Sequence, residues 1–235
     1  MAMIDSPKIV YQEIQFHSWF ALEPGGSCPN NKVFLLPNSD MALLAVLNSP
    51  LMWWVLTRTL PHMKDEALSP AGFIMENLRV VVPGGNLRDR IVSITEHLYK
   101  HSEHYHAWEG DTLASLQEVV GRETLDDRCL TWLRRPATDF VRMMRTRMKC
   151  SVTPALETRL AKLHEKMASE LGSFLLEQLN QEKRLAGLVE DAYGLTLEER
   201  LLLHNTRPVR DPIDVLEARL KGMENLSSAA QSGDE

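Results

Sequence analysis

The chain has 235 residues, of which 44% are hydrophobic, so it is long enough to enclose a substantial core and is not a disordered chain. It carries 26 basic and 32 acidic residues, a formal charge of −6. This balance excludes a uniformly basic surface for nucleic acid or for an acidic membrane, so any such binding must use a local patch.

Cysteine content and the pattern of apolar runs indicate the cellular compartment of the protein. Cys28, Cys129 and Cys150 are odd in number and far apart, which argues against a disulfide framework and is compatible with a reducing cytoplasm. No signal-peptide pattern opens the chain, and its longest apolar runs, residues 41–47 and 51–56, are too short to span a bilayer. We therefore expect a soluble cytoplasmic protein that does not enter a membrane.

The first residues alternate apolar and polar side chains in the manner of β-strands. Strands are predicted over residues 8–14, 17–22 and 33–36, with turns at the Pro-Gly-Gly of 24–26 and the Pro-Asn-Asn of 29–31. Because residues 8–14 come almost at the start of the chain, this strand is expected at an unpaired edge. Such an edge invites pairing, so we expect a partner or a rearranged segment of this chain to cover it.

Helical periodicity replaces this alternation in the following stretch. A helix is predicted from Met41, capped by Ser39 or Asp40, and Pro50 begins a second helical segment. The Trp53–Trp54 pair is expected to anchor this segment on the sheet as part of the core.

The clearest boundary signal is the Pro-Gly-Gly of residues 83–85, which follows a short strand predicted at residues 80–82. Beyond it the sequence is helical, and Pro136 ends the third of the helices that follow. These helices are predicted from residue 86 or 87 to about 104, over 111–120 and over 125–135.

The longest predicted helix runs from about residue 153 to 193 and carries one apolar stripe on an otherwise charged rod, so it must lie against something. Gly194 ends it, and Thr196 with Glu199 forms a capping box for a short following helix. The predicted fold class is α+β. It comprises a small mixed β-sheet with packed helices (residues 1–83), a helical region (84–226) and a disordered tail (227–235).

The sequence lacks the common motifs of catalytic sites. The sequence has no phosphate-binding glycine loop, no Gly-x-Ser-x-Gly elbow, no Cys-x-x-Cys and no His-Glu-x-x-His, so we expect no catalytic residue and no metal ligand. His97, His101 and His104, with His106 nearby, share one helix face where Zn²⁺ or Ni²⁺ could bind. The alternative is a solvated, histidine-rich face, because no fourth ligand is implied.

A basic stretch stands out in this acidic protein. Six cations lie between residues 134 and 149 against the single acid Asp139. They could neutralise phosphates or pair with the acidic long helix that follows, and composition leaves both interpretations open. The six are Arg134, Arg135, Arg142, Arg145, Arg147 and Lys149.

Several blocks, in order, suggest a family. "PKIVYQEI", "FALEPGG", "PNNKVFLLP", "DMALLAVLNSPLMWWVLTR", "LSPAGF" and "LRVVVP" resemble the TaqI-like C-terminal specificity (target recognition) domain of adenine-specific DNA methyltransferases. That domain occurs in type IIG restriction-modification enzymes and related phage-defence methyltransferases. "LRRPATDFVRMM" and "LAGLVEDAYGLTLEERLLL" extend the resemblance to about residue 205.

The resemblance implies that the chain selects a DNA target while a separate Rossmann-like domain binds S-adenosylmethionine and methylates the flipped adenine. This chain has no Asn-Pro-Pro-Tyr motif and no cofactor loop, so it is expected to hold no cofactor and to be no enzyme itself. Its expected partners are DNA and an adenine-specific methyltransferase chain, or an N-terminal domain missing here. The S-adenosylmethionine is expected on that partner.

The leading hypothesis is therefore a DNA sequence-recognition module of a restriction-modification or phage-defence system. The alternative is a helical subunit that scaffolds the methyltransferase without reading DNA. A stand-alone nuclease or methylase needs catalytic residues that the sequence does not contain. The predicted DNA-contacting residues are Lys8, Gln12, His17, Arg58, His62, Lys64, Arg134, Arg135, Arg142 and Arg145.

Overall fold

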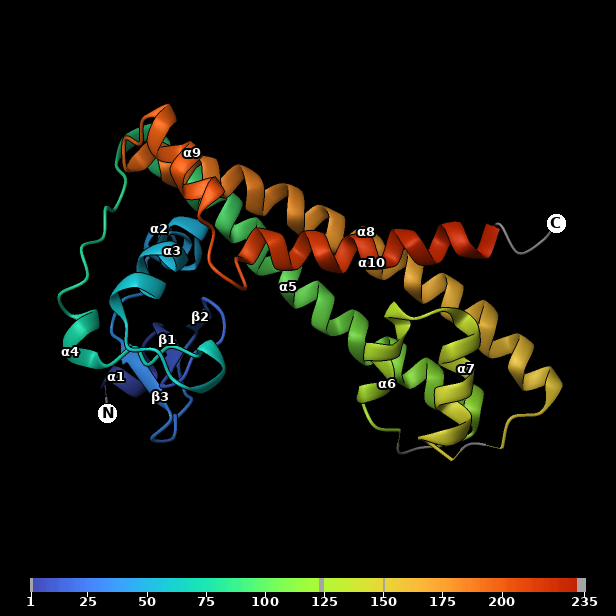
Figure 1. Cartoon of the computed structure of the whole chain (residues 1–235). Helices are drawn as coiled ribbons and strands as arrows, with labels where there is room; N and C mark the ends of the chain where they lie inside the picture. Colours follow the sequence, from blue (N-terminus) through green and yellow to red (C-terminus); the bar gives the residue numbers. More distant parts are fainter. Residues whose placement is uncertain (1, 123–124, 150, 232–235) are drawn as a thin grey trace. The chain divides into compact units, whose positions relative to one another are not determined.

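The computed structural model describes residues 2–122, 125–149 and 151–231 and confirms the α+β class (Figure 1). The chain divides into two compact units. The sheet unit comprises Met1–Leu98 and Asn180–Val215, and the helical unit comprises Tyr99–Leu179 and Leu216–Glu235. The sequence-based division at residue 83 does not coincide with these limits, because the two longest helices each contribute to both units.

A three-stranded sheet forms from β1 (Lys8–Gln12), β2 (Phe20–Glu23) and β3 (Val33–Leu36). The order is β2-β1-β3 and both pairings are antiparallel, so the expectation of a mixed sheet is wrong. Val10 lies opposite Ala21 on one side and Leu35 on the other. The first strand is therefore central: the expectation of a strand without neighbours is wrong, and of the two predicted coverings, a partner or a segment of this chain, the structure shows the second.

The turn after β2 requires glycine. Gly25 has a φ of 118°, and a Cβ added there would meet the carbonyl oxygen of Asp5 at 2.5 Å. The amide of Gly26 donates to the carbonyl of Ile4 at 3.0 Å. This turn is thereby joined to the short helix α1 (Ala2–Asp5).

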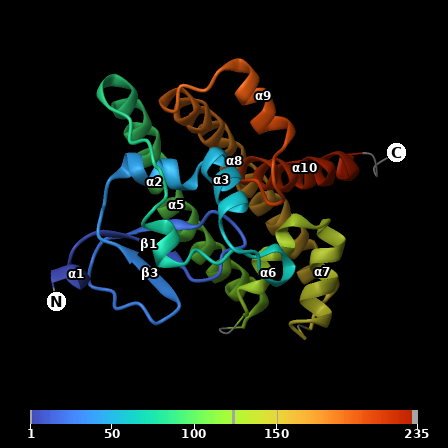
Figure 2. The same ribbon diagram turned by 60° about the vertical axis from the view of Figure 1, so that its left-hand side comes forward.

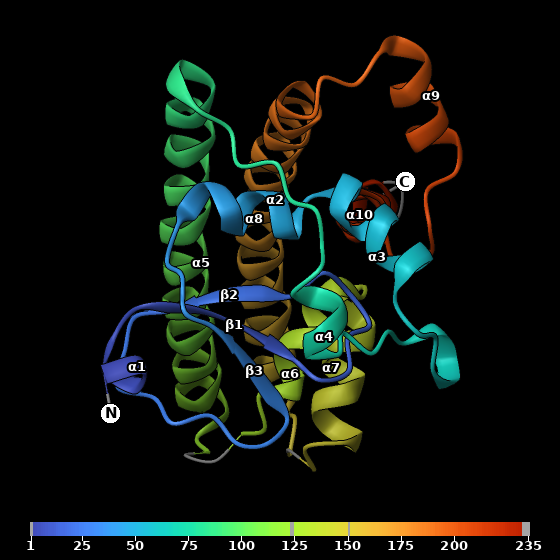
Figure 3. The same ribbon diagram turned by 90° about the vertical axis from the view of Figure 1, so that its left-hand side faces the viewer.

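Two apolar helices pack on the sheet, α2 (Met41–Asn48) and α3 (Pro50–Thr59), visible beside the strands in Figure 3. Asp40 caps α2 by accepting from the amide of Ala42 at 2.8 Å. Ser49 caps α3 by accepting from the amide of Met52 at 3.1 Å. These caps explain why the helices begin where local sequence predicts them.

Trp53 lies at the centre of the core of the sheet unit, together with Ile9 and Leu56. Its indole nitrogen donates to the carbonyl of Val209 at 3.1 Å. Trp54 is only partly buried, and its indole nitrogen donates to the hydroxyl of Thr206 at 2.9 Å. The predicted anchoring role is confirmed for Trp53.

Short elements complete the sheet unit, with segments of the long helices α5 (Gly85–Val120) and α8 (Pro154–Ala192). Residues 80–82, predicted as a strand, have no regular secondary structure. The short elements are η1 (Lys64–Glu66), α4 (Gly72–Met75) and α9 (Leu197–Asn205).

Helix α5 (Gly85–Val120) is continuous, so the predicted break between residues 104 and 111 is wrong. Gly110 costs only about 1 kcal/mol relative to alanine in a helix, and the rings of Tyr105 and Trp108 pack on Phe174. This packing offsets the weak local propensity.

The helical unit contains further short elements beside its parts of α5 and α8 (Figure 2). The helix predicted over residues 125–135 is broken into a short helix and a 3₁₀ turn, and Pro136 precedes the next helix. The elements are α6 (Arg128–Thr131), η2 (Trp132–Arg134) and α7 (Ala137–Thr146).

The long helix α8 (Pro154–Ala192) confirms the prediction to within a residue at each end. Gly194, with a φ of 65°, ends it in a Schellman motif, in which the amide of Leu195 donates to the carbonyl of Glu190 at 3.2 Å. Helix α10 (Pro212–Gln231) includes residues 227–231, which were predicted to be disordered. Residues 232–235 lie outside the described residues.

Two expectations drawn from composition, one about membrane-spanning helices and one about cysteines, can be compared with the structure. Over the part of the chain that the structure describes, no single helix has the length and apolar character needed to cross a bilayer, and only the bent pair α2 and α3, at 62°, meets both criteria together. Cys28 is an exposed and Cys129 a buried free thiol, while Cys150 lies outside the described residues.

Candidate nucleic-acid interface

The connection between β1 and β2 presents aromatic side chains to solvent from a firmly held main chain. Gln15 and Leu68 exchange two main-chain hydrogen bonds of 2.9 and 2.8 Å, and the Ser18 hydroxyl donates to the carbonyl of Leu47 at 2.6 Å. Between and beyond these anchors, Phe16 is 41% and Trp19 55% exposed. We call residues 14–19 the aromatic connection.

A distant segment joins this connection through Leu68. One side of Leu68 pairs with Gln15 and the other with His62. The turn between them is tight, because the amide of Met63 donates to the carbonyl of Ala67 at 2.7 Å. The fold thus brings residues 62–68 beside the aromatic connection, as the sequence-based grouping of His17, His62 and Lys64 requires.

Arg210 adds a cation from much later in the chain. Its guanidinium carbon lies 4.9 Å from the centroid of the Phe16 ring, a cation–π contact. Four buried atoms here have no hydrogen-bond partner among the described residues, namely both amide atoms of Gln15, Nη1 of Arg210 and Oδ2 of Asp211. Buried polar atoms are usually paired, so their concentration in these neighbouring segments is unusual.

Lys8 does not belong to this surface. Its side chain is only 1% exposed, forms an ion pair with Glu23 and donates to the carbonyls of Ile4 at 2.7 Å and Ser6 at 3.2 Å. The hydrogen bond from Lys8 lowers the pKa of Glu23 to about 2. Because all three ammonium donors are used inside the protein, we withdraw Lys8 from the predicted DNA contacts.

The other predicted residues on the first strands are accessible. Gln12 is exposed at the end of β1, opposite Val33. His17 is partly buried, and its ring lies 5.2 Å from that of Trp19, centroid to centroid. These two rings form a composite aromatic surface on the connection.

Arg58 and His62 are exposed but engaged. Arg58 stacks on Trp54 at 3.7 Å and donates to the carbonyl of Thr206 at 3.2 Å. His62 lies 2.7 Å from the carbonyl of Thr57 through Nε2 and 2.9 Å from Glu66 through Nδ1. The Thr57 carbonyl and the Glu66 carboxylate both raise the pKa of His62, because both favour the protonated ring.

Lys64, in η1, is exposed beside the strained residues Asp65 and Glu66, whose φ angles are 60° and 57°. Such left-handed backbone is uncommon outside glycine and fixes a sharp turn. The turn carries the acids Asp65 and Glu66 as well as the base Lys64. The positive charge of this surface therefore comes from Lys64 together with Arg210.

The basic stretch in the helical unit is exposed at all six cations. Arg142 pairs with Asp139 at 2.8 Å on its own helix, and Arg145 pairs with Glu157 in the first turn of α8 at 3.2 Å. Internal pairing thus accounts for two of the cations. Arg134 and Arg135, the other predicted contacts, form no ion pair with any side chain that the structure describes.

The histidine cluster shows no metal geometry. His101 Nε2 lies 3.0 Å from the carbonyl of Phe174, and the two rings are in contact at 5.3 Å. Among the side chains that the structure describes, no group of three or more His, Cys, Asp and Glu residues is placed to hold a metal ion.

Sequence reasoning missed Phe16, Gln15 and Arg210. Residue type could not have identified the connection, because polar Gln15 and Ser18 are buried and aromatic Phe16 and Trp19 are exposed, the reverse of the usual preference. No local signal links Arg210 to Phe16, because 193 residues separate them and only the fold brings them together.

Comparisons with known proteins add no information about this site. No family model, no curated protein and no solved structure matched the chain.

Proposed function

We propose that this chain is the DNA sequence-recognition module of an adenine-specific DNA methyltransferase in a restriction-modification or phage-defence system. The order of sequence blocks that resemble a target-recognition domain supports the proposal. The observation that carries it is the aromatic connection, where exposed Phe16 and Trp19 stand on a fixed main chain beside Arg210. Aromatic rings of this kind stack on bases or wedge between base steps.

The net charge of −6 favours action in a complex, in the cytoplasm where the DNA lies. The electrostatic contribution supplies essentially all non-specific affinity for DNA, so an acidic reader binds weakly unless a partner adds basic surface. In this proposal the methyltransferase chain supplies that surface, the S-adenosylmethionine and the catalytic pocket, and this chain supplies the choice of site.

The test compares methylation patterns of the reconstituted complex on plasmid libraries, read by sequencing. Replacing Phe16 and Trp19 together by alanine is expected to relax site choice or to weaken specific binding by about tenfold or more, since stacking contributes about 1–3 kcal/mol per base. Phe73→Ala is the matched control, because Phe73 is also in the sheet unit and is 71% exposed. An unchanged target sequence and unchanged affinity in the double variant would rule out this role.

A second candidate is a scaffold that holds the methyltransferase without reading DNA. Three leucines of α9 are unusually exposed, Leu197 at 74%, Leu201 at 52% and Leu202 at 56%. Large exposed apolar patches mark interaction sites in soluble proteins. We call these three residues the leucine face.

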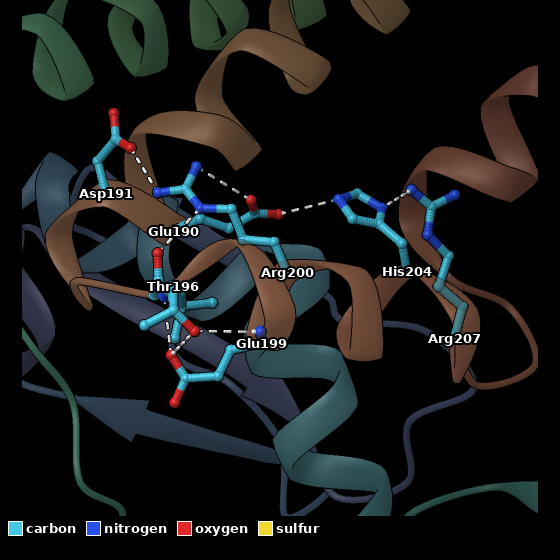
Figure 4. A network of polar contacts seen from close by, with 8 residues as sticks. Glu190, Asp191, Thr196, Glu199, Arg200, His204 and Arg207 are labelled. Carbon is cyan, nitrogen blue, oxygen red and sulfur yellow. Dashed lines mark hydrogen bonds and ion pairs between the residues drawn. The ribbon is translucent and has the colours of Figure 1, made fainter.

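Polar contacts made by α9 support this candidate (Figure 4). Arg200 pairs with Asp191 at 2.7 Å and with buried Glu190 at 3.5 Å, and His204 lies 3.6 Å from Glu190. Arg207 continues the network, donating to His204 at 2.6 Å. These contacts fix α9 on the end of α8 and orient the leucine face outward.

The two candidates are separated by assembly measurements. Leu201→Arg is expected to lower the mass of the complex with the methyltransferase, measured by size-exclusion chromatography with light scattering, if the leucine face is the assembly surface. Leu176→Arg, on α8 and 48% exposed, is the control. A complex that forms normally but loses its target preference on changing the aromatic connection supports DNA recognition instead.

A further inference from the structure

The aromatic connection belongs to a larger set of exposed apolar side chains in the sheet unit. Besides Phe16 and Trp19, Ile14 on the connection is 38% exposed. The segment that pairs with the connection through Leu68 adds Met63, which is 47% exposed. Large apolar side chains at the surface mark contacts with a partner. We call Ile14, Phe16, Trp19 and Met63 the apolar patch.

The main chain that carries the two rings is anchored on both sides of them. Before the first ring, Gln15 exchanges two main-chain hydrogen bonds with Leu68. After the second ring, the amide of Phe20 donates to the side chain of Asn48 at 3.0 Å, and its carbonyl accepts from the same side chain at 2.8 Å. A support fixed in this way lets the rings press into another molecule while the connection keeps its shape.

Polar side chains near the patch are not available to read base edges. Gln15 and Ser18 are 1% and 7% exposed, and Ser18 donates to a main-chain carbonyl. His62 is engaged at both ring nitrogens, one with the carbonyl of Thr57 and the other with Glu66. Direct readout of sequence needs accessible donors and acceptors. Contact of the patch with DNA would therefore be made mainly by apolar groups.

Two cations accompany these apolar side chains. The guanidinium carbon of Arg210 lies 4.9 Å from the centroid of the Phe16 ring, and Lys64 is exposed on the turn that carries Met63. Cations beside an apolar contact can bind the flanking phosphates, and such contacts position a protein on DNA without specifying its sequence. The charges near the patch thus suit the backbone of a duplex, and the apolar groups suit its stacked bases.

We propose that the apolar patch is a wedge, which inserts between stacked base pairs and kinks the duplex. This inference rests on the proposed role in DNA recognition. Proteins that kink DNA insert Phe, Ile, Met or Leu side chains between base steps, and Phe16, Ile14 and Met63 are of these types. Pyrimidine–purine steps unstack most easily. The DNA that suits this surface is therefore a duplex with such a step, selected by its deformability.

The test measures binding of the full chain, at low salt, to three end-labelled duplexes of equal length. One is a stiff A-tract, one has a central TA step that kinks easily, and one has a central unpaired bulge. Fluorescence anisotropy gives the affinity, and energy transfer between dyes at the two ends reports the bend. Because the bulge is already unstacked, that duplex is expected to bind about tenfold or more tightly than the A-tract. The TA duplex is expected to lie between them and to bend on binding.

Paired variants distinguish a wedge from a ring that only stacks on a base. Phe16→Leu with Trp19→Leu keeps apolar volume and removes both rings, so the preference for the bulged duplex is expected to stay within threefold of that of the parent. Phe16→Ala with Trp19→Ala removes the wedge, so the preference and the bending of the TA duplex are expected to disappear. Phe73→Ala with Val82→Ala is the control, because these residues of the sheet unit are also exposed, at 71% and 48%.

Circular dichroism melts establish that each variant folds. Equal affinity for the three duplexes, without bending of the TA duplex, would overturn the wedge and leave the proposed DNA recognition standing. The wedge is also overturned if the leucine variant loses the preference as the alanine variant does, because ring stacking then accounts for binding. Absence of binding to all three duplexes, both by the chain at low salt and by its complex with the methyltransferase, would overturn the proposed function as well.

Discussion

Lys8 shows how one side chain can look like a DNA contact in sequence and be a core residue in the fold. Its alternation with apolar neighbours is typical of a strand whose polar side faces solvent. Because β1 is central and Glu23 lies in register opposite Lys8, both charges are paired across two strands and Lys8 is almost fully buried. The pairing partner follows from strand order, which the local pattern does not contain.

Removing the charge of Lys8 is expected to destabilise the sheet unit strongly. Lys8→Met leaves the largely buried Glu23 carboxylate unpaired, and breaking such a pair costs about 3–5 kcal/mol. Urea unfolding followed by circular dichroism measures the loss. The double variant Lys8→Met with Glu23→Met should recover much of it, because no charge remains uncompensated.

Lys32 provides the matched control. It pairs with Glu13 at 2.8 Å, but its side chain is 65% exposed, so Lys32→Met is expected to cost less than about 1 kcal/mol. Equal losses for the two lysine variants would contradict the structural role assigned to Lys8.

At the scale of elements, local signals identified the ends of helices better than their continuity. Each helix cap is formed by hydrogen bonds between residues that are close in the sequence. The predicted cap geometry is present at Asp40, at Gly194 and at the Thr196–Glu199 pair. The continuity of α5 depends instead on contacts of Tyr105 and Trp108 with Phe174, about 70 residues away. Sequence spacing cannot supply such contacts, so the predicted break was wrong.

The candidate sites likewise have some features that the sequence shows and others that only the fold shows. The basic stretch was visible as composition, and the Arg142–Asp139 pair is local to α7, but the pairing of Arg145 with Glu157 depends on where α8 begins. Arg210 was not singled out, because it acquires its role from Phe16. The number of cations is a property of the sequence, whereas their exposure and their grouping with aromatic rings are properties of the fold.

The capping box of α9 offers a test at this scale. The amide of Glu199 donates to the Thr196 hydroxyl at 3.3 Å, and the amide of Thr196 donates to the Glu199 carboxylate at 2.8 Å. Thr196→Ala is expected to cost about 1 kcal/mol. Hydrogen exchange of α9 should increase more than that of α2, whose own cap is intact. Equal exchange in both helices would show that the box does not hold α9.

For the whole molecule, burial of two titratable groups predicts opposite responses to pH. His164 is buried in the helical unit, and burial lowers its pKa below 6.5 although the main chain at Arg135 and Leu133 favours the protonated ring. The unfolded chain then binds a proton more readily than the folded one. The free energy of unfolding is therefore expected to fall as pH drops below about 6.5.

Glu182, on α8 in the sheet unit, gives the opposite trend, because burial raises its pKa from 4.5 to about 7. Below pH 4.5 both states are protonated, and between pH 4.5 and 7 the unfolded chain loses its proton first, so this group lowers stability as pH rises. Glu182→Gln is expected to raise the free energy of unfolding at pH 8 by at most about 3 kcal/mol, the full value of a pKa shift from 4.5 to about 7, and to change it little at pH 4.5.

Both trends can be measured on one set of samples, with urea unfolding at pH 5, 6.5 and 8. His164→Leu should raise stability at pH 5 relative to pH 8, whereas Glu182→Gln should raise it at pH 8 relative to pH 5. Because the two groups lie in different units, the double variant is expected to show the sum of the two changes. A single-variant profile parallel to that of the parent would mean that the group concerned titrates alike in the folded and unfolded states.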